Sequence, residues 1–157
     1  MLVIKKLSKE IAKQQRDIQA VADIEAMIQL ADAWNYETIT DLLMQDSVKL
    51  LIVTSSASNI IGYCLYQVIF EQAEILRIGT HPDYQRQGIA SQLLIALNNE
   101  LKSNKVTSLL LEVREDNSAA IALYEQQGFT VIHRRKGYYQ QPQQPAIDAL
   151  IMQLSDS

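Results

Sequence analysis

Apolar positions in the first third of the chain follow mainly helical spacing. Leu2–Leu7 is typical of a short strand, and the polar segment Ser8–Gln15 is ambiguous. From Asp17 onwards, apolar residues recur every three or four positions, as on one face of a helix. They are Ile18, Val21, Ile24, Ile28 and Ala31, and the pattern stops near residue 34. Asn35 predicts the start of a second helix, ending at Leu43, because its side chain can accept a free backbone N–H.

The spacing then changes to that of strands. Lys49–Thr54 and Ile60–Phe70 are rich in β-branched and aromatic residues and flank the polar segment Ser55–Asn59. This arrangement predicts a hairpin. Ala73–Thr80 has the same character and predicts a further strand, closed by the residues His81–Asp83.

The second half of the chain contains the clearest helix. Gly88–Lys102 carries an apolar stripe. The stripe consists of Ile89, Leu93, Leu97 and Leu101, with Ala90 and Leu94 beside it. Thr107–Arg114 is a nearly continuous apolar run, which favours a strand covered on both faces. Asn117–Gln127 predicts a helix that ends at Gly128, since glycine commonly follows a helix C-terminus.

Two last strands complete the pattern. Phe129–Arg135 and Ile147–Leu154 predict a hairpin around the loop Tyr138–Pro145. Strands and helices interleave along the chain, which indicates an α/β fold whose sheet mixes antiparallel hairpins with parallel crossovers. The length of 157 residues favours a single domain, 1–157.

Charge and composition exclude several classes of protein. Fourteen basic and eighteen acidic residues give a net charge of −4, which argues against a nucleic-acid partner and favours neutral or cationic ones. The apolar runs are too short to span a membrane, and the N-terminal segment lacks the order of a secretory signal. We therefore expect a soluble, cytoplasmic protein.

Cysteine and histidine usage argues against a metal site. The single cysteine, Cys64, rules out an internal disulfide and a cysteine-based zinc site, and we interpret it as a buried apolar residue. His81 and His133 are far apart in sequence and have no partners at ligand spacing. We therefore expect no metal.

One turn has the character of an anion site. Gln85–Ala90 lies between a predicted strand and the strongest helix. Backbone N–H groups at a helix N-terminus are unpaired and carry partial positive charge, so they can hold a phosphate. Gly88 would let the backbone approach the anion closely. The alternative is an ordinary strand–turn–helix connection, because the chain has no G-x-G-x-x-G and no Gly-Lys-Ser/Thr.

Two polar side chains lie in apolar surroundings. Burial of Glu112 in its strand predicts a raised pKa and a general base near neutral pH. The alternative is a structural ion pair with Arg114 or Arg77. Tyr124 shares a helix face with apolar residues. Without further context it is a core tyrosine whose hydroxyl reaches the rim.

Together these segments resemble the GNAT N-acetyltransferases, and within them the bacterial RimI type, the ribosomal-protein-alanine N-acetyltransferases. The matching stretches are HPDYQRQGIASQLL, LLLEVREDNSAAIALYEQQGF and GYY with DALIM. They cover about half of the chain in the expected order. The resemblance implies the GNAT fold, a mixed central β-sheet flanked by helices on both faces, and acetyl-CoA as cosubstrate.

The resemblance also implies a role for each matched position. Glu112 would be the general base and Tyr124 the general acid. The turn would hold the CoA pyrophosphate and the strand before it would pair with the pantetheine arm. The residues implied in CoA binding are Ile78, Gly79, Thr80, Gln85, Arg86, Gln87, Gly88, Ile89, Ala90, Ser91 and Asn117.

The chain departs from the family pattern at four places. Ala90 replaces the last glycine of the turn, and Ser91 stands where an arginine is frequent, so a positive charge beside CoA is lost. Ala33–Asn35 replaces Pro-Trp-Ser on the acceptor side, and the N-terminal region is several residues longer. We expect Trp34 to contact the acceptor. Tyr138 and Tyr139 either line the peptide groove or pack over the sheet edge.

The expected reaction is direct acetyl transfer to a protein N-terminal α-amine, with a small-subunit ribosomal protein beginning with alanine as partner. The alternatives are a GNAT enzyme acting on a protein lysine or a small amine, and an acetyl-CoA-binding module without turnover. The presence of both Glu112 and Tyr124 argues against the last. The sequence leaves the oligomeric state open between a monomer and a weak dimer.

Overall fold

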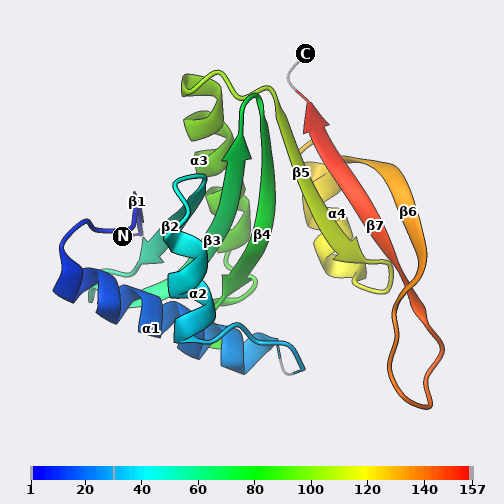
Figure 1. Cartoon of the computed structure of the whole chain (residues 1–157), viewed down its shortest axis with the longest axis horizontal. Coiled ribbons are helices and arrows are strands. Elements are labelled where there is room, and N and C mark those ends of the chain that lie inside the picture. Colours follow the sequence, from blue (N-terminus) through cyan, green and yellow to red (C-terminus); the bar gives the residue numbers. More distant parts are fainter. Residues whose placement is uncertain (1, 30, 156–157) are drawn as a thin grey trace.

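A seven-stranded mixed sheet with the strand order β1-β2-β3-β4-β5-β7-β6 organises the chain (Figure 1). The computed structural model describes residues 2–29 and 31–155. The strands are β1 (Val3–Lys6), β2 (Val48–Thr54), β3 (Ile60–Ile69), β4 (Gln72–Thr80), β5 (Ser108–Arg114), β6 (Thr130–Tyr139) and β7 (Ile147–Ser155). The helices are α1 (Ile11–Ile28), α2 (Tyr36–Leu43), the short 3-10 helix η1 (Pro82–Tyr84), α3 (Ile89–Ser103) and α4 (Ser118–Gln126). None of the described helices is both long and apolar enough to cross a membrane.

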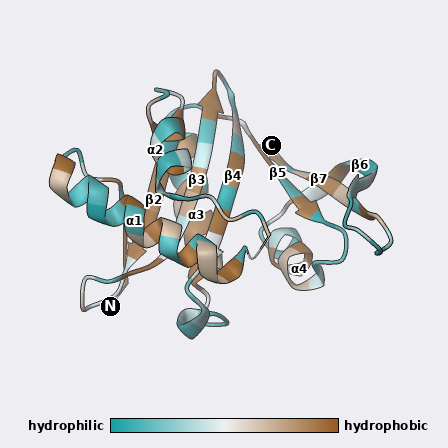
Figure 2. Ribbon diagram, turned by 60° about the horizontal axis from the view of Figure 1, so that its bottom comes forward, coloured by the Kyte–Doolittle hydropathy of each residue, from teal (hydrophilic) through white to brown (hydrophobic). Residues whose placement is uncertain are grey.

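Helices cover both faces of the sheet, as the resemblance implies. Helices α1 and α2 pack on one face, and α3 and α4 pack on the other (Figure 1). In Figure 2 hydrophilic and hydrophobic segments alternate along α1, as expected for a helix with one apolar face. The apolar stripe predicted for α3 is confirmed, because Leu93, Leu97 and Leu101 are buried in the larger core cluster. Asn35 caps α2 as predicted, with Oδ1 accepting the backbone N–H of Thr38 at 2.9 Å.

Helix α1 differs from its prediction at both ends. It begins at Ile11 rather than Asp17, and its first turns are largely solvent-exposed, so no apolar periodicity marks them. Backbone hydrogen bonds form there without core contacts, so hydropathy alone could not locate this end. The helix stops at Ile28, and Ala31 is exposed outside it.

Strands β4 and β5 are paired over only part of their length. Their parallel ladder joins Gln72–Glu74 to Ser108–Leu110 and extends no further among the described residues. Beyond it the two strands diverge (Figure 1). We call this region the sheet opening, bounded by Ile75–Thr80 of β4 and Leu111–Arg114 of β5. Because the ladder stops at Glu74, the edge of β4 that faces β5 has no strand partner over the rest of β4.

Two predictions for the C-terminal strands are corrected. Strand β5 is not covered on both faces: Leu109, Leu111 and Val113 are buried, but the alternate residues are only half-buried because α1 and α2 pack on β2, β3 and β4. Strand β6 does not end at Arg135 but continues to Tyr139, so both tyrosines lie in a strand rather than a loop. The predicted hairpin of β6 and β7 is confirmed.

Candidate active site

The turn before α3 exposes a row of backbone donors. Gly88 is the N-cap of α3 and has φ of +80°, a left-handed conformation that glycine adopts without strain. Within the described chain, the backbone N–H groups of residues 86–91 donate to no protein acceptor. The first four N–H groups of a helix have no partner inside it. A built Cβ on Gly88 meets no atom within 4 Å, so the space above the turn is open.

The structure therefore places most of the residues expected at CoA in one continuous stretch. Gln85–Gly88 are exposed, while the side chain of Ile89 is buried and leaves only its backbone available. Strand β4 leads directly into this turn, and its unpaired edge over Ile78–Thr80 borders the sheet opening. Asn117 stands apart at the start of α4, where Oδ1 accepts the N–H of Ala120 at 3.2 Å. Its amide NH₂ group donates to no acceptor among the described residues and is available for a contact with CoA.

Glu112 lies on the face of β5 opposite the larger core cluster. Leu111 and Val113 point into that cluster, so the strand alternation directs Glu112 to the face on which α1 and α2 lie. Its side chain is 28% exposed. The buried Oε1 has no hydrogen-bond partner among the described residues. It is 3.8 Å from Nη1 of Arg135, which is close enough for an ion pair but too far for a hydrogen bond.

The ion pairs considered from the sequence are wrong. Arg114 binds Asp116, with two contacts of 3.0 Å, and Arg77 lies at Asp32 and Glu25. The partner of Glu112 is Arg135, which comes from β6 across β7. Strand order could not be derived from the local pattern, so sequence analysis missed this pair.

Tyr124 is on the other face of the sheet. It is 7% exposed and belongs to the larger core cluster, with the Phe129 ring 5.8 Å away. Burial raises the pKa of Tyr124 to about 12, so its phenol remains a proton donor at neutral pH. Glu112 and Tyr124 thus approach from opposite faces of the sheet, on strand β5 and on the helix that follows it.

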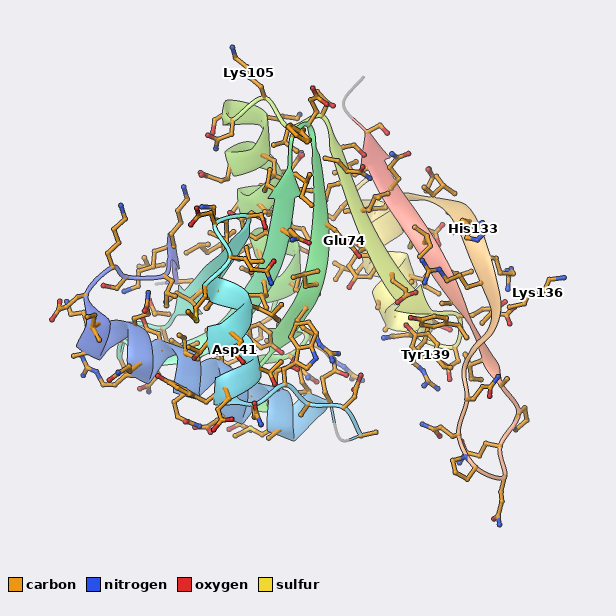
Figure 3. All side chains as sticks on the ribbon, in the orientation of Figure 1. Asp41, Glu74, Lys105, His133, Lys136 and Tyr139 are labelled. Atoms are coloured by element: carbon orange, nitrogen blue, oxygen red, sulfur yellow. The ribbon has the colours of Figure 1, made fainter. Side chains whose placement is uncertain are left out.

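Tyr139 lies beside Glu112. Its pKa is raised to about 12, mainly by burial and then by the negative charge of Glu112. The Arg114 guanidinium covers its ring at 5.2 Å. Tyr138 is half-exposed, and the guanidinium carbon of Arg135 lies over its ring, 5.2 Å from the ring centroid. Figure 3 shows Tyr139 near the ends of β5 and β7, whereas Lys136 points outward from β6.

A bulge in β6 sets the position of these tyrosines. Between Arg135 and Tyr139, strand β6 has four residue steps against two on β7. Gly137 has φ of +61°, and Oδ1 of Asp148 accepts its N–H at 2.8 Å. Arg134 binds the other oxygen of Asp148 at 3.0 Å. These contacts, first the Gly137 N–H and then Arg134, lower the pKa of Asp148.

Trp34 lies in the loop between α1 and α2, facing the same side of the sheet as Glu112. Its backbone N–H donates to Glu25 Oε1 at 3.1 Å, and the Arg77 guanidinium stacks over its ring at 4.3 Å. Arg77 belongs to the part of β4 that borders the sheet opening, so its contacts hold this loop at the same opening.

Sequence analysis missed Glu25, Tyr63 and Arg77, which hold this loop. The hydroxyl of Tyr63 donates to Glu25 Oε2, and Arg77 donates to the backbone oxygen of Asp32 at 2.9 Å. A signal was present: Glu25 is a charged residue inside the apolar stripe of α1, between Ile24 and Ile28.

Cysteine chemistry does not contribute to this site. Cys64 is completely buried, as predicted, and burial raises the pKa of its thiol to about 12. A protonated, buried thiol is a poor nucleophile. In the described ranges, 2–29 and 31–155, no three His, Cys, Asp or Glu side chains gather closely enough to hold a metal ion.

Comparisons with known proteins agree with this geometry. The sequence profile of the Acetyltransferase (GNAT) family matches residues 15–129. A [ribosomal protein bS18]-alanine N-acetyltransferase of Haemophilus ducreyi is 33% identical over 140 residues, which cover 89% of this chain and 94% of that protein. The Escherichia coli K12 protein of the same name is 37% identical over 123 residues, covering 78% and 81%.

Solved structures show the same architecture. The crystal structure of the ribosomal-protein-S18-alanine N-acetyltransferase from Escherichia coli superposes with a TM-score of 0.87 at 33% identity, covering 100% of this chain and 95% of that one. Ard1 from Thermoplasma volcanium, at 24% identity, shares the fold with a TM-score of 0.81, covering 99% and 98%. The profile match, the relatives and the sheet opening lead to one conclusion: this chain belongs to the GNAT family of N-acetyltransferases.

Proposed function

We propose that this chain, as one domain over residues 1–157, transfers the acetyl group of acetyl-CoA directly to a protein N-terminal α-amine. The preferred acceptor is the N-terminal alanine of ribosomal protein bS18. The observation that carries the chemistry is Glu112: its Oε1 is buried, has no hydrogen-bond partner within residues 2–29 and 31–155, and lies beside the sheet opening. Relatives named for acetylation of bS18 alanine, at 33–37% identity, support the acceptor.

Acetyl-CoA, the cosubstrate of GNAT enzymes, fits the donor groups around the opening. The unpartnered N–H groups of residues 86–91 suit the pyrophosphate. The unpaired edge of β4 at Ile78–Thr80 suits the amides of the pantetheine arm. Backbone donors near Gly79 would polarise the thioester carbonyl as negative charge develops on its oxygen.

Glu112 and Tyr124 divide the proton transfers. Glu112 accepts a proton from the ammonium group, directly or through water, and the neutral amine attacks the thioester carbonyl carbon. The N–C bond forms, the attacking nitrogen loses its second proton to solvent water, and the C–S bond breaks as the tetrahedral intermediate collapses. Tyr124, held protonated by burial, donates to the leaving sulfur and recovers its proton from solvent afterwards.

An α-amine suits a site with one base. Its reference pKa is about 7.7–8.0, against about 10.4 for lysine. Near pH 7.5 roughly a third of α-amines are neutral, but only about one lysine in a thousand. Trp34, Tyr138 and Tyr139 would frame a narrow groove for a chain end with a small first side chain.

The test is a peptide that begins with alanine and carries one internal lysine. Mass spectrometry after reaction with acetyl-CoA should place the acetyl group on the α-amine, and an otherwise identical peptide with a blocked N-terminus should not react. Acetyl found only on lysine, or faster reaction of a peptide with a bulky first residue, would overturn the acceptor while leaving the GNAT assignment intact.

A further inference from the structure

A buried acidic side chain in α1 connects three separate parts of the chain. Glu25 is 1% exposed. Its Oε1 accepts the Trp34 N–H at 3.1 Å, and its Oε2 accepts the Tyr63 hydroxyl. The Nε atom of Arg77 lies 3.6 Å from Oε1. We call Glu25, Trp34, Tyr63 and Arg77 the Glu25 cluster.

The Glu25 cluster holds the loop that faces the acceptor side. Arg77 contacts the loop twice more, by stacking on the Trp34 ring and by donating to the backbone oxygen of Asp32. Arg77 also pairs with the Asp32 carboxylate at 3.2 Å, and both of its contacts to Asp32 are exposed to solvent, unlike the buried contacts of Glu25. The loop is therefore attached to the sheet mainly through polar contacts to Glu25 and Arg77, in addition to the apolar packing of Trp34.

The same cluster lies on the strand expected to hold the thioester. Tyr63 is the register partner of Gly79, and a Cβ at Gly79 would come within 2.5 Å of the Tyr63 hydroxyl oxygen. The hydroxyl bound to Glu25 thus packs directly on the β4 backbone at the sheet opening. Burial and the negative charge of Glu25 raise the pKa of Tyr63, which keeps its hydroxyl a donor.

Burial of the charged side chains of the Glu25 cluster lowers the stability of the fold unless other contacts compensate. Removing charged groups from water is expensive, and apolar side chains of similar volume often serve stability equally well or better. What the polar cluster provides, and apolar packing does not, is a directed bond to one backbone N–H, that of Trp34. This bond holds the residue directly before Asn35, the N-cap of α2.

We propose that Glu25 is a positioning residue for acceptor binding: through Trp34 and Arg77 it holds the α1–α2 loop against β4 at the sheet opening. The proposal rests on the proposed function for its acceptor. Its main consequence is that loss of the Tyr63–Glu25 bond affects acceptor binding, while CoA binding is unchanged because the turn at Gly88 and the backbone edge of β4 remain in place.

The α1–α2 loop contains a residue whose fluorescence can be measured. Trp34 is the only tryptophan of the chain, so its fluorescence reports the loop directly. In the full-length protein, Tyr63→Phe and Glu25→Gln should increase quenching of Trp34 by acrylamide. This measurement needs no acceptor, so it tests the proposal even where the alanine peptide is not a substrate.

Kinetics provide the second readout. With an alanine-first peptide, Tyr63→Phe and Glu25→Gln should raise the acceptor KM about fivefold or more, with the KM for acetyl-CoA unchanged. The two substitutions should be non-additive when combined, because they act on one bond network.

Tyr66→Phe is the matched control. Tyr66 is on the same strand and equally buried, but it faces the larger core cluster on the other side of the sheet. It should leave Trp34 quenching and both KM values as in the wild type. The proposal is overturned by folded Tyr63→Phe and Glu25→Gln proteins with unchanged quenching and acceptor KM, or by Tyr66→Phe changing both to the same extent. Increased quenching without any acetylation of the alanine peptide by the wild type would refute the acceptor alone.

Discussion

The two sides of the sheet opening are built in different ways. The proposed cofactor side consists of backbone N–H groups from one continuous stretch, residues 86–91, and the edge of the strand before it. The proposed acceptor side consists of side chains from separate segments, among them Trp34 from a loop, Glu112 from β5 and Tyr139 from a bulge in β6. A backbone site depends on local conformation, whereas a side-chain site depends on how distant segments pack. Single substitutions should therefore have separable effects on the two substrates.

The largest effect is expected at Glu112. Glu112→Gln removes the base but keeps the shape, so kcat should fall about 10²–10⁴-fold. Calorimetric titration with CoA should give an unchanged affinity.

Glu74→Gln is the control for Glu112→Gln. Glu74 is exposed on β4, at the last residue pair of the ladder between β4 and β5 (Figure 3). Its turnover should equal that of the wild type. Near-normal turnover of Glu112→Gln at every pH would show that the base is a different group.

The next effect is expected at Tyr124. Tyr124→Phe should lower kcat by about 10² while the KM for acetyl-CoA changes little, because a donor to the leaving sulfur acts in the transition state. Burial raises the pKa of Tyr124 from 10.0 to about 12, so the protonated donor persists through pH 10. The wild-type rate should therefore show no falling limb from Tyr124 between pH 6 and pH 10. Initial rates over that range test both statements.

A smaller effect, confined to the cofactor, is expected at Gly88. Gly88→Val should weaken CoA binding at least tenfold, about 1.4 kcal/mol, because a branched side chain enters the open space above the turn. It also strains the backbone, since φ is +80° there. Gly88→Asn separates the two causes, because asparagine tolerates this conformation. Unchanged CoA affinity in a folded Gly88→Val protein would remove the turn from the cofactor site.

The smallest effect is expected at the β6 bulge. Asp148→Ala removes the acceptor of the Gly137 N–H and the partner of Arg134, so Tyr139 should lose part of its support. We expect the acceptor KM to rise about two- to fivefold, the range of an exposed ion pair, with CoA affinity unchanged. A rise in the KM for acetyl-CoA of the same size would contradict the separation of the two sides.

Elements with a strong local signal were predictable from the sequence. Helix α3, the cap at Asn35 and the hairpin of β2 and β3 appear as expected because apolar spacing and turn residues act over a few positions. The first turns of α1 were not predictable, since their hydrogen bonds form without apolar contacts. The extension of β6 to Tyr139 was missed because it depends on a bulge at Gly137. The residue that anchors this bulge, Asp148, lies eleven residues further along the chain.

The sequence by itself determined the order of the elements, the turn before α3 and the resemblance through which Glu112 and Tyr124 were singled out. Only the tertiary structure decided that β7 lies between β5 and β6, that Arg135 rather than Arg114 meets Glu112, and that Glu25 supports the Trp34 loop. The physical reason is the distance along the chain over which each kind of interaction acts. Backbone geometry and apolar periodicity act between neighbours along the chain, whereas a buried polar side chain is satisfied by whichever segments the packed sheet brings to it.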